Sequence, residues 1–279
     1  MLITRHDEAR AVLADPSHIP PPVRQDAPYA TLGWLRAQVS RFASGEIHAE
    51  RRRLAVRHLD GLDPARLRAA AAERTRELVG ELGEAPVFLV RERVVEAGIQ
   101  TAVLGAALGV AEAADLVRVV DVVSTGYLSG DGGPAQDAAV AALLTLVGGT
   151  DTADAVARAA LLLQGHASTA GLVRNALAGA DRLGPGEPVE GLLHETLRHD
   201  PPLAATRRVA VGGAGEVVEL DLVAANRDPA VFPEPERFDT GRGASPYLTF
   251  GHGVRPCPGS AHAFAIAAGV VETVLQEER

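Results

Sequence analysis

The sequence predicts a mainly helical protein with a small β part. Residues 151–180 are rich in alanine, leucine and valine and carry few charges, and a helix that is apolar on every side is a buried one. Other apolar segments are bounded by Asp-Pro pairs or by prolines, which commonly limit helices. Valines and glycines in residues 207–222 instead favour short strands.

Several helices are expected in the first half of the chain. Asp63 is placed at an N-cap, and Pro64 at the first helical position, where its missing N–H costs nothing. A short first helix stops at Asp15-Pro16. The helical segments expected here are 7–14, 47–58, 65–82, 94–108 and 113–123, of which 47–58 is rich in arginine.

The second half continues this pattern after a glycine-rich loop at residues 129–134, which is flexible by composition. The buried helix at 151–180 is followed by a shorter one at 188–199, which ends at Asp200-Pro201-Pro202. Residues 229–243 form an irregular segment punctuated by proline, and 260–277 form a last apolar helix. No linker divides the chain, so residues 1–279 are expected to form a single domain.

Composition limits the classes of function. The net charge is −9 and the chain contains no lysine, so nucleic acid is not expected as the main partner, although a local basic patch remains open. A single cysteine excludes an internal disulfide and fits a reducing compartment. The N-terminus lacks a signal-peptide pattern, and no apolar run approaches the roughly 20 residues of a membrane helix. We therefore expect a cytoplasmic protein without a membrane anchor.

The only cysteine lies in the segment Phe250-Gly-His-Gly-Val-Arg255-Pro-Cys257-Pro-Gly259, directly before the last helix. Backbone amides at a helix N-terminus lower the pKa of a thiol, and a thiolate can ligate iron. Arg255 could bind a carboxylate. A lone cysteine is more often an inert buried residue, but the spacing of its neighbours argues otherwise.

This spacing of phenylalanine, glycine, arginine, cysteine and glycine resembles the haem-binding signature of cytochromes P450, of which a proline after the cysteine is a tolerated variant. The resemblance implies the cytochrome P450 fold and haem b (iron protoporphyrin IX) as cofactor. It implies Cys257 as the axial iron ligand, with Phe250, Arg255 and Gly259 in the haem-binding loop. A bacterial, soluble member of the family is the nearest type.

Other segments resemble the family in the same order along the chain. His194-Glu195-Thr196-Leu197-Arg198 is similar to the E-x-x-R helix, in which the pair binds an arginine of the following irregular segment. Arg237, in Pro235-Glu236-Arg237-Phe238, is expected at that place. A buried triad of this kind would fix the segment beneath the thiolate loop, and losing one member would cost about 3–5 kcal/mol. On its own, such a pair is usually a solvated surface contact.

The resemblance also supplies partners for the haem propionates. His48 and Arg52, four residues apart, match the H-x-x-x-R of the family, and Arg208 and Arg255 match two further propionate ligands. The alternative for a histidine–arginine pair on a helix is a solvated surface.

The central helix departs from the family pattern. Its usual acid and alcohol deliver protons to dioxygen, but here Ala167 takes the place of the acid, Ser168 that of the threonine, and Thr169 follows. Ser168 and Thr169 are expected to handle protons near the haem, and His166 to face away. Proton delivery by a positioned acid is typically worth about 10²–10⁴-fold, so oxygen activation is expected to be slow or rerouted.

The chain is shorter than the usual member at both ends and between residues 109 and 150, where relatives form a lid over the substrate pocket. Loop 129–134 is expected to be what remains of that lid. A reduced lid suggests an open site, a large or carrier-bound substrate, or a partner chain over the gap, for example in a homodimer.

Three functions stay open at this point. The first is a monooxygenase that oxidises a small organic substrate with dioxygen and electrons from ferredoxin and ferredoxin reductase, in secondary-metabolite biosynthesis. The second is a haem-thiolate enzyme with atypical chemistry: peroxide-driven oxidation, rearrangement, dehydration or bond formation. The third is a non-catalytic relative. The sequence does not name the substrate.

Overall fold

The computed structural model describes residues 1–111, 113–149, 151–183, 186–211 and 215–278. Helices dominate, as the sequence predicts, and four short strands form one sheet. In chain order the elements are β1 (Leu2–Ile3), α1 (His6–Ala14), β2 (His18–Ile19), α2 (Leu32–Gln38), η1 (Ser40–Phe42), α3 (Gly45–Asp60), α4 (Pro64–Leu82), α5 (Val87–Glu96), α6 (Ile99–Ala107), α7 (Ala113–Tyr127), α8 (Pro134–Val147), α9 (Thr152–Ala180), α10 (Val189–His199), β3 (Ala205–Ala210), β4 (Val217–Asp221), α11 (Leu222–Ala225), η2 (Thr240–Arg242) and α12 (Ser260–Glu277).

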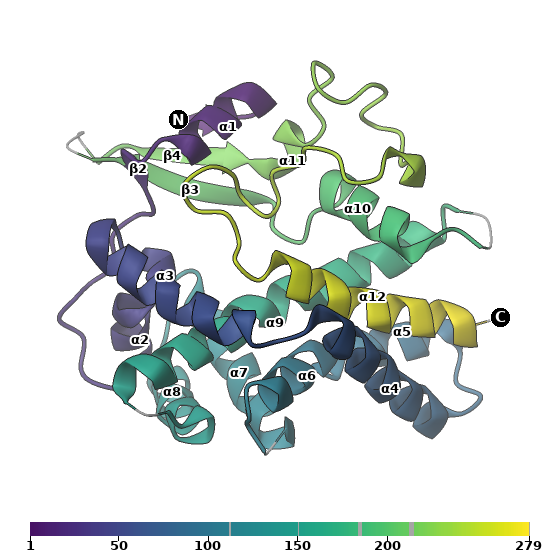
Figure 1. Cartoon of the computed structure of the whole chain (residues 1–279), viewed down its shortest axis with the longest axis horizontal. Coiled ribbons are helices and arrows are strands. Elements are labelled where there is room, and N and C mark those ends of the chain that lie inside the picture. Colours follow the sequence, from purple (N-terminus) through teal and green to yellow (C-terminus); the bar gives the residue numbers. More distant parts are fainter. Residues whose placement is uncertain (112, 150, 184–185, 212–214, 279) are drawn as a thin grey trace.

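The sheet joins the beginning of the chain to its later part. Its strand order is β1-β4-β3-β2, with β1 parallel to β4 and the other pairs antiparallel. Together with α1 and α11 the sheet forms one end of the molecule (Figure 1). Its apolar side chains form a small cluster with α1, which contains Ile3, Ala9, Leu13, Val218, Leu220, Leu222, Ala225 and Leu248.

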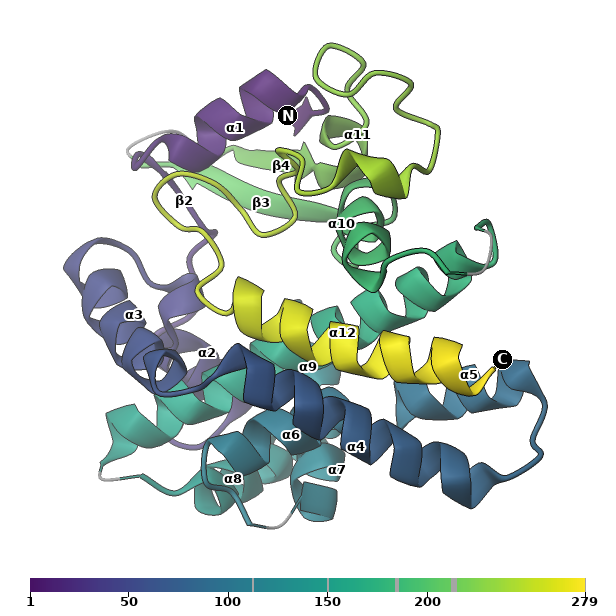
Figure 2. The same cartoon turned by 45° about the vertical axis from the view of Figure 1, so that its right-hand side comes forward.

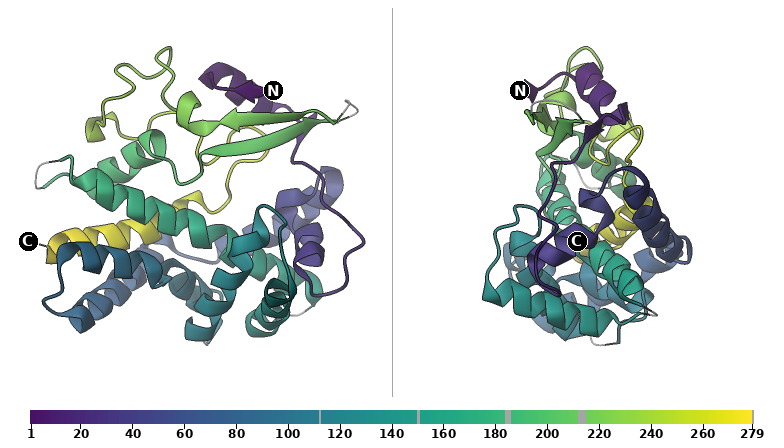
Figure 3. Two further views of the ribbon diagram at one scale, coloured as in Figure 1. Left: turned by 180° about the vertical axis from the view of Figure 1, so that it is seen from behind. Right: turned by 90° about the vertical axis from the view of Figure 1, so that its left-hand side faces the viewer.

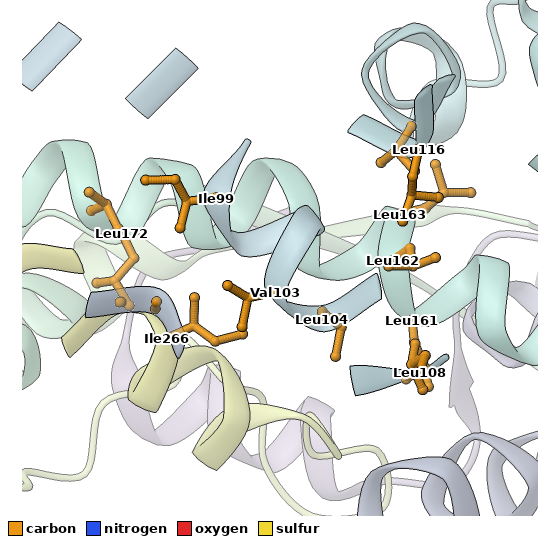
Figure 4. Close-up of a cluster of buried hydrophobic side chains, with 14 of the residues drawn as sticks. Ile99, Val103, Leu104, Leu108, Leu116, Leu161, Leu162, Leu163, Leu172 and Ile266 are labelled. Atoms are coloured by element: carbon orange, nitrogen blue, oxygen red, sulfur yellow. The ribbon is translucent and has the colours of Figure 1, made fainter. Parts of the chain in front are cut away.

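The remaining helices form a second, larger body, and α9 crosses its interior (Figures 1 and 2). Seen from behind, α9 runs between the sheet end and the helices α4 to α8 (Figure 3). Residues of α6, α9 and α12 meet in the middle of this core, where Val103, Leu162 and Ile266 are all buried (Figure 4). The burial expected for residues 151–180 is therefore confirmed for most of α9.

Helices α12 and α4 pack unusually closely. A Cβ added at Gly269 of α12 would lie 2.2 Å from the carbonyl oxygen of Arg68 in α4. Any side chain there would therefore push the two helices apart. This contact fixes the body of α12, and hence the end from which the cysteine loop leaves.

Most of the predicted helix limits are confirmed. The side chain of Asp63 accepts a hydrogen bond from the N–H of Ala65, and α10 ends at His199 before Asp200. The continuous segment expected over 94–108 is wrong, because Gly98 adopts a left-handed φ of +65° and separates α5 from α6. The sequence interpretation did not propose β1, β2, α2 or α8.

The predicted strands and the predicted lid region are described only in part. Residues 212–214, between β3 and β4, and residues 112 and 150, in the shortened lid region, lie outside the described residues. The loop expected at 129–134 joins α7 to α8, with Pro134 as the first residue of α8. Arg36 of α2 donates a hydrogen bond to the carbonyl of Leu128 at the start of this loop.

Within the described part of the chain, no single helix is long and apolar enough to cross a membrane. Helices α8 and α9 meet the combined criteria of length, hydropathy and low charge only when taken together, across a bend of 109°.

Candidate functional site

The cysteine loop connects the two hydrophobic clusters. Leu248, near its start, belongs to the cluster beneath the sheet, whereas Ile266, in α12, belongs to the helical core. Between them the chain descends from the sheet to α12, in front of β3 (Figure 2). Cys257 therefore lies where the two parts of the molecule meet, and packing on both sides fixes its position.

Backbone contacts close this loop into a tight turn. The N–H of Cys257 donates to the carbonyl of Phe250 over 2.7 Å. Gly253 has a φ of +66°, and a Cβ there would lie 2.3 Å from the Cα of Ala14. Only glycine fits both demands, because the turn passes directly against the end of α1. Phe250 packs against the helical core beside Tyr247.

The thiol of Cys257 is accessible on one side and surrounded by protein on the others. Burial raises its pKa, against the opposing influence of the Gly259 N–H and of Arg52 and Arg41. The expectation that the helix terminus lowers the pKa of this thiol is therefore wrong for the protein alone, because desolvation of the thiolate outweighs the backbone amide. A cationic iron centre would reverse that balance, because a metal deprotonates the thiol it binds.

Cationic side chains from three elements converge beside the thiol. Arg52 of α3 donates to the carbonyl of Pro256, directly before the cysteine, over 2.5 Å. Arg255 donates to the carbonyl of Ala43 over 2.8 Å. These bonds join the start of α3 to the cysteine loop. The structure thus places the guanidinium of Arg52 beside the residue before Cys257 and ties Arg255 to the residues before α3. Their role as propionate ligands stays a prediction.

The charges of these arginines disfavour one another and disfavour protonation of His48. Burial, assisted by the charges of Arg255 and Arg52, lowers the pKa of His48 to about 4, so its imidazole is neutral at pH 7. Burial likewise lowers the pKa of Arg208, on β3, to about 10, assisted by Arg255 and Arg41. The sequence interpretation did not single out Arg41, and only its place in the fold reveals it.

No carboxylate of the described residues forms an ion pair with any member of this cluster. The members, called the cation cluster below, are the four arginines Arg41, Arg52, Arg208 and Arg255 together with the neutral imidazole of His48. Buried charges are normally paired. An accessible thiol beside a surplus of uncompensated cations therefore fits a cofactor that brings a metal and two carboxylates, as haem does.

The central helix α9 has an accessible face in its middle. Residues 155–157 and 159–163 are buried, but Ala167 and Ser168 are exposed in the middle of the helix. The hydroxyl of Ser168 donates to the carbonyl of Gln164 over 2.7 Å. Thr169 is only 3% exposed and points into the packed side. Of the two expected proton-handling residues, Ser168 alone is accessible.

His166 faces away from that open side, as expected. Its Nδ1 lies 2.8 Å from the hydroxyl of Thr101 on α6, and its Nε2 lies 3.4 Å from a carboxylate oxygen of Asp121 on α7. Burial lowers the pKa of His166. Its position packs α9 against α6 and α7, so it does not replace the acid missing at Ala167.

Glu195 and Arg198 form a fully buried ion pair on α10. Two hydrogen bonds of 2.6 and 2.9 Å join the guanidinium to the carboxylate, and the side chains are 0% and 1% exposed. Arg198 also donates to the backbone carbonyls of Asn226, Pro235 and Arg237. Because the pair is bidentate and its remaining donors are satisfied, it pins the irregular segment to α10.

The expected contact between the side chain of Arg237 and the buried ion pair is wrong. Its side chain is 63% exposed and lies 3.4 Å from Glu234, so only its backbone carbonyl reaches Arg198. Instead, Nε of Arg242 lies 3.6 Å from Glu195, and the side chain of Arg242 is 14% exposed. The sequence spacing from Pro235 could not show which of these two arginines points inward, because the turn between them decides the direction of each side chain.

Asn226 is a further scaffold residue whose contacts the sequence did not reveal. Its side chain accepts from the N–H of Leu248 over 2.7 Å and donates to the hydroxyl of Thr249 over 2.9 Å. Thr249 in turn donates to the carbonyl of Leu197 on α10. A chain of hydrogen bonds therefore runs from the helix with the buried ion pair to the residue directly before Phe250.

Comparison with known proteins agrees with this geometry. Residues 189–277 match the family model described as Cytochrome P450. This segment of the chain is therefore similar to the cytochrome P450 family. It is 38% identical over 118 residues to cyclomarin C epoxidase CymV of Salinispora arenicola (strain CNS-205), covering 36% of this chain and 30% of that protein. It is 42% identical over 93 residues to the biotin biosynthesis cytochrome P450 of Bacillus subtilis (strain 168), covering 30% of this chain and 24% of the relative.

Solved structures show that the fold extends over the whole chain. The structure of P450BioI, in a complex with a fatty acid ligated to acyl carrier protein, aligns with a TM-score of 0.80 and 22% identity, over 99% of this chain and 84% of that one. A thermophilic cytochrome P450 from Sulfolobus tokodaii aligns with a TM-score of 0.76 and 20% identity, over 98% and 86%. This confirms the predicted P450 fold. By sequence, the chain spans only 24–30% of the length of the first two curated relatives.

Members of this P450 family bind haem through a cysteine thiolate. In this chain Cys257 is the one cysteine, and its loop is the only segment that offers a thiolate. The cofactor of this P450 is therefore haem. The residues that would hold it are those of the cysteine loop and the cation cluster.

Proposed function

We propose that this P450 is a haem-thiolate oxidoreductase that oxidises a small organic substrate by inserting oxygen. The observation that carries the proposal is the position of an accessible thiol between the two packed parts of the molecule, beside the uncompensated cation cluster. Bound haem supplies oxygen activation, which the electron density of a thiolate ligand favours. The chain is proposed to act as one haem-binding domain.

Each residue of the site has its own proposed role. The thiolate of Cys257 holds iron; His48, Arg52, Arg208 and Arg255 bind the propionates. Phe250 and Gly259 shape the loop. Ser168 can exchange its bond to the Gln164 carbonyl for one to water or substrate, and so hold a proton on the open face of α9. Thr169 supports that turn of the helix from its buried side.

Substrate and partners follow from the relatives as proposals. Their printed names include an epoxidase and an enzyme of biotin biosynthesis, and one neighbour binds an acyl carrier protein. A biosynthetic substrate, free or carrier-bound, is consistent with these relatives. We also propose that the protein works in the cytoplasm and receives electrons from a ferredoxin and its reductase. A homodimer would cover the reduced lid region.

A carbon monoxide spectrum tests the proposal. The reduced haem-loaded protein should show the red-shifted Soret band of thiolate ligation, and Cys257→Ala should abolish it. Val254→Ala, an exposed position in the same loop, is the matched control and should keep the band. A protein that folds but takes up no haem, or that shows a nitrogen-ligated spectrum, would overturn the proposal.

A second candidate function is favoured by one observation. Ala167 lies on the accessible face of α9. In the family this position carries the acid that delivers protons, and in this chain that acid is missing. Peroxide-driven oxidation, or a rearrangement, dehydration or bond formation, would need no such acid. Turnover with peroxide but not with a ferredoxin couple would support this candidate.

The variant Ala167→Glu separates the two candidates. If proton delivery limits the reaction, the new acid should raise reductant-driven turnover by about 10-fold or more. Ala178→Glu, at another exposed position of α9, is the control and should have no effect. Efficient reductant-driven turnover in the unchanged protein would rule the second candidate out.

A further inference from the structure

A cavity of about 220 Å³ lies between α3 and α9. Its walls come from residues 38–40, from α3 and from the first half of α9. Leu54, Val156, Ala157 and Ala160 make much of the lining apolar. Thr152 and Ala153 are exposed, so the cavity opens to solvent at the beginning of α9.

Arg51 is the only ionisable side chain among the described residues that line this cavity. Its guanidinium donates to the carbonyl of Ala37 over 2.6 Å and to the side-chain oxygen of Gln38 over 3.2 Å. Both acceptors are neutral, and no described carboxylate forms an ion pair with Arg51. Burial lowers its pKa, against the raising influence of neighbouring Glu50. Two of its five N–H groups are thus used, and its charge is not neutralised.

The acids near the cavity mouth are engaged elsewhere. Asp151 accepts the N–H of Asp154 as the N-cap of α9, and Asp154 lies 2.8 Å from Nε2 of His58. The hydroxyls of Ser40 and Thr152 add neutral donors to the lining. An anion of modest size would therefore find one cation, two hydroxyls and an apolar wall.

The cavity and the proposed reaction site share one face of α9. Ala160, Gln164 and Ser168 are spaced four residues apart, which places them on one stripe of the helix. Ala160 lines the cavity, and Ser168, two helical turns further along α9, is exposed. The eight residue steps from Ala160 to Ser168 rise about 12 Å along the helix. A ligand anchored at Arg51 could therefore extend along this stripe to the proposed reaction site.

We propose that the cavity binds the carboxylate end of an elongated organic acid, with the carboxylate at Arg51 and the apolar chain lying along α9 toward Ser168. This inference rests on the proposed function and names its substrate class. A chain long enough to reach Ser168 from Arg51 is required, so short acids should fit the cavity without approaching the reaction site.

Ligand titrations of the haem-loaded protein test the inference. Straight-chain carboxylic acids of increasing length are compared with primary alcohols of the same length, and binding is followed by the spin-state shift of the Soret band. Arg51→Gln keeps a polar side chain but removes the charge. Arg53→Gln, on the exposed side of the same helix, is the matched control. The shift in melting temperature caused by each ligand gives a second readout that does not depend on haem.

Charge-assisted hydrogen bonds are worth about 1.5–3 kcal/mol, or roughly 10- to 100-fold in affinity. The unchanged protein should therefore prefer long acids to the matched alcohols, and Arg51→Gln should weaken the acids by about that factor while leaving the alcohols and Arg53→Gln unchanged. Short acids should shift the melting temperature but not the spin state.

Three results would overturn the inference. One is equal affinity for acids and alcohols in the unchanged protein, a comparison that needs no variant. Another is an unchanged acid affinity in Arg51→Gln. The third is loss of haem in Arg51→Gln but not in Arg53→Gln, which would make Arg51 a propionate ligand. Should Arg51→Gln fail to fold, Arg51→Lys must retain the preference for acids. A protein that binds no haem refutes the proposed function instead.

Discussion

At the scale of single residues, the identity of the inward-facing arginine is the sharpest difference between the prediction from sequence and the structure. Arg237 lies two residues and Arg242 seven residues after Pro235. Only Arg242 approaches Glu195, while Arg237 projects outward toward Glu234. The difference has a measurable consequence, because a buried charge near an ion pair contributes to stability and an exposed one contributes little.

We predict that Arg242→Gln lowers the free energy of unfolding by about 1–3 kcal/mol, because Glu195 loses its second cation in a buried setting. Arg237→Gln should change it by no more than about 0.5 kcal/mol, since its side chain is exposed. Urea unfolding of both variants measures the two values. The reverse order of effects would restore Arg237 as the scaffold residue.

The cation cluster makes the haem-free protein sensitive to acid. The pKa of His48 lies at about 4 in the folded protein, against 6.5 as its ordinary value. Between these values the unfolded chain binds more protons, so the stability contributed by neutral His48 is present above pH 6.5 and is lost as the pH falls toward 4. Burial of His166 and His194 lowers their pKa values and acts in the same direction.

We therefore predict that the melting temperature of the haem-free protein falls between pH 7 and pH 5, and falls less in His48→Gln. A neutral glutamine cannot take up the proton that the unfolded chain gains at this position. Calorimetry of the two proteins over this pH range measures the difference. Parallel pH profiles would show that His48 is not held neutral by its surroundings.

At the scale of elements, the pairing of α12 with α4 sets the position from which the cysteine loop departs. The approach is possible because Gly269 presents no side chain to the backbone of α4. By contrast, Gly80 lies within α4 and has open space around its Cβ position. Substitution of each glycine therefore distinguishes two effects. Gly269 tests the packing of α12 against α4, and Gly80 tests only the helix preference for alanine over glycine.

We predict that Gly269→Ala destabilises the protein by about 1–3 kcal/mol, as overpacking does. Gly80→Ala should stabilise it by roughly 0.5–1 kcal/mol, because alanine is the better helix former. Thermal unfolding of the two variants distinguishes them. Similar effects of the same sign at both positions would mean that the close helix contact is not tightly packed.

At the scale of the whole molecule, the site joins two bodies that are otherwise packed separately. The cluster beneath the sheet contains far fewer buried residues than the helical core. Arg52 and Arg255 reach across from α3 and the loop. The covalent links are the chain between β2 and α2, the chain between α10 and β3, and the loop before α12 (Figure 1). Haem bound at the junction would touch both bodies and stabilise their arrangement by mass action.

We predict that haem removal accelerates amide hydrogen exchange most in the sheet, in α1 and in residues 243–259, and least in α9 and α12. The smaller cluster has less buried surface to resist local opening. Exchange monitored by mass spectrometry with and without haem tests this. Uniform acceleration over the whole chain, or none, would show that the two parts unfold together.

The sequence by itself determined the local features of this protein. The limits of most helices and the buried character of α9 depend on short-range pattern: caps, prolines and periodic apolar residues. The Glu195–Arg198 pair and the role of Cys257 before α12 were expected from short motifs that resemble those of the P450 family. These features act over a few residues, and so they can be recognised without knowing the rest of the chain.

The tertiary structure decided what long-range packing controls. It brought Arg41 into the cation cluster, turned Arg242 rather than Arg237 toward Glu195, tied Asn226 to the cysteine loop and left Arg51 alone in a cavity. It also reversed the expected shift of the thiol pKa, because burial depends on every neighbouring element. Side chains far apart in sequence meet only when two helices or a helix and a loop pack, and no local pattern fixes the direction in which each one points.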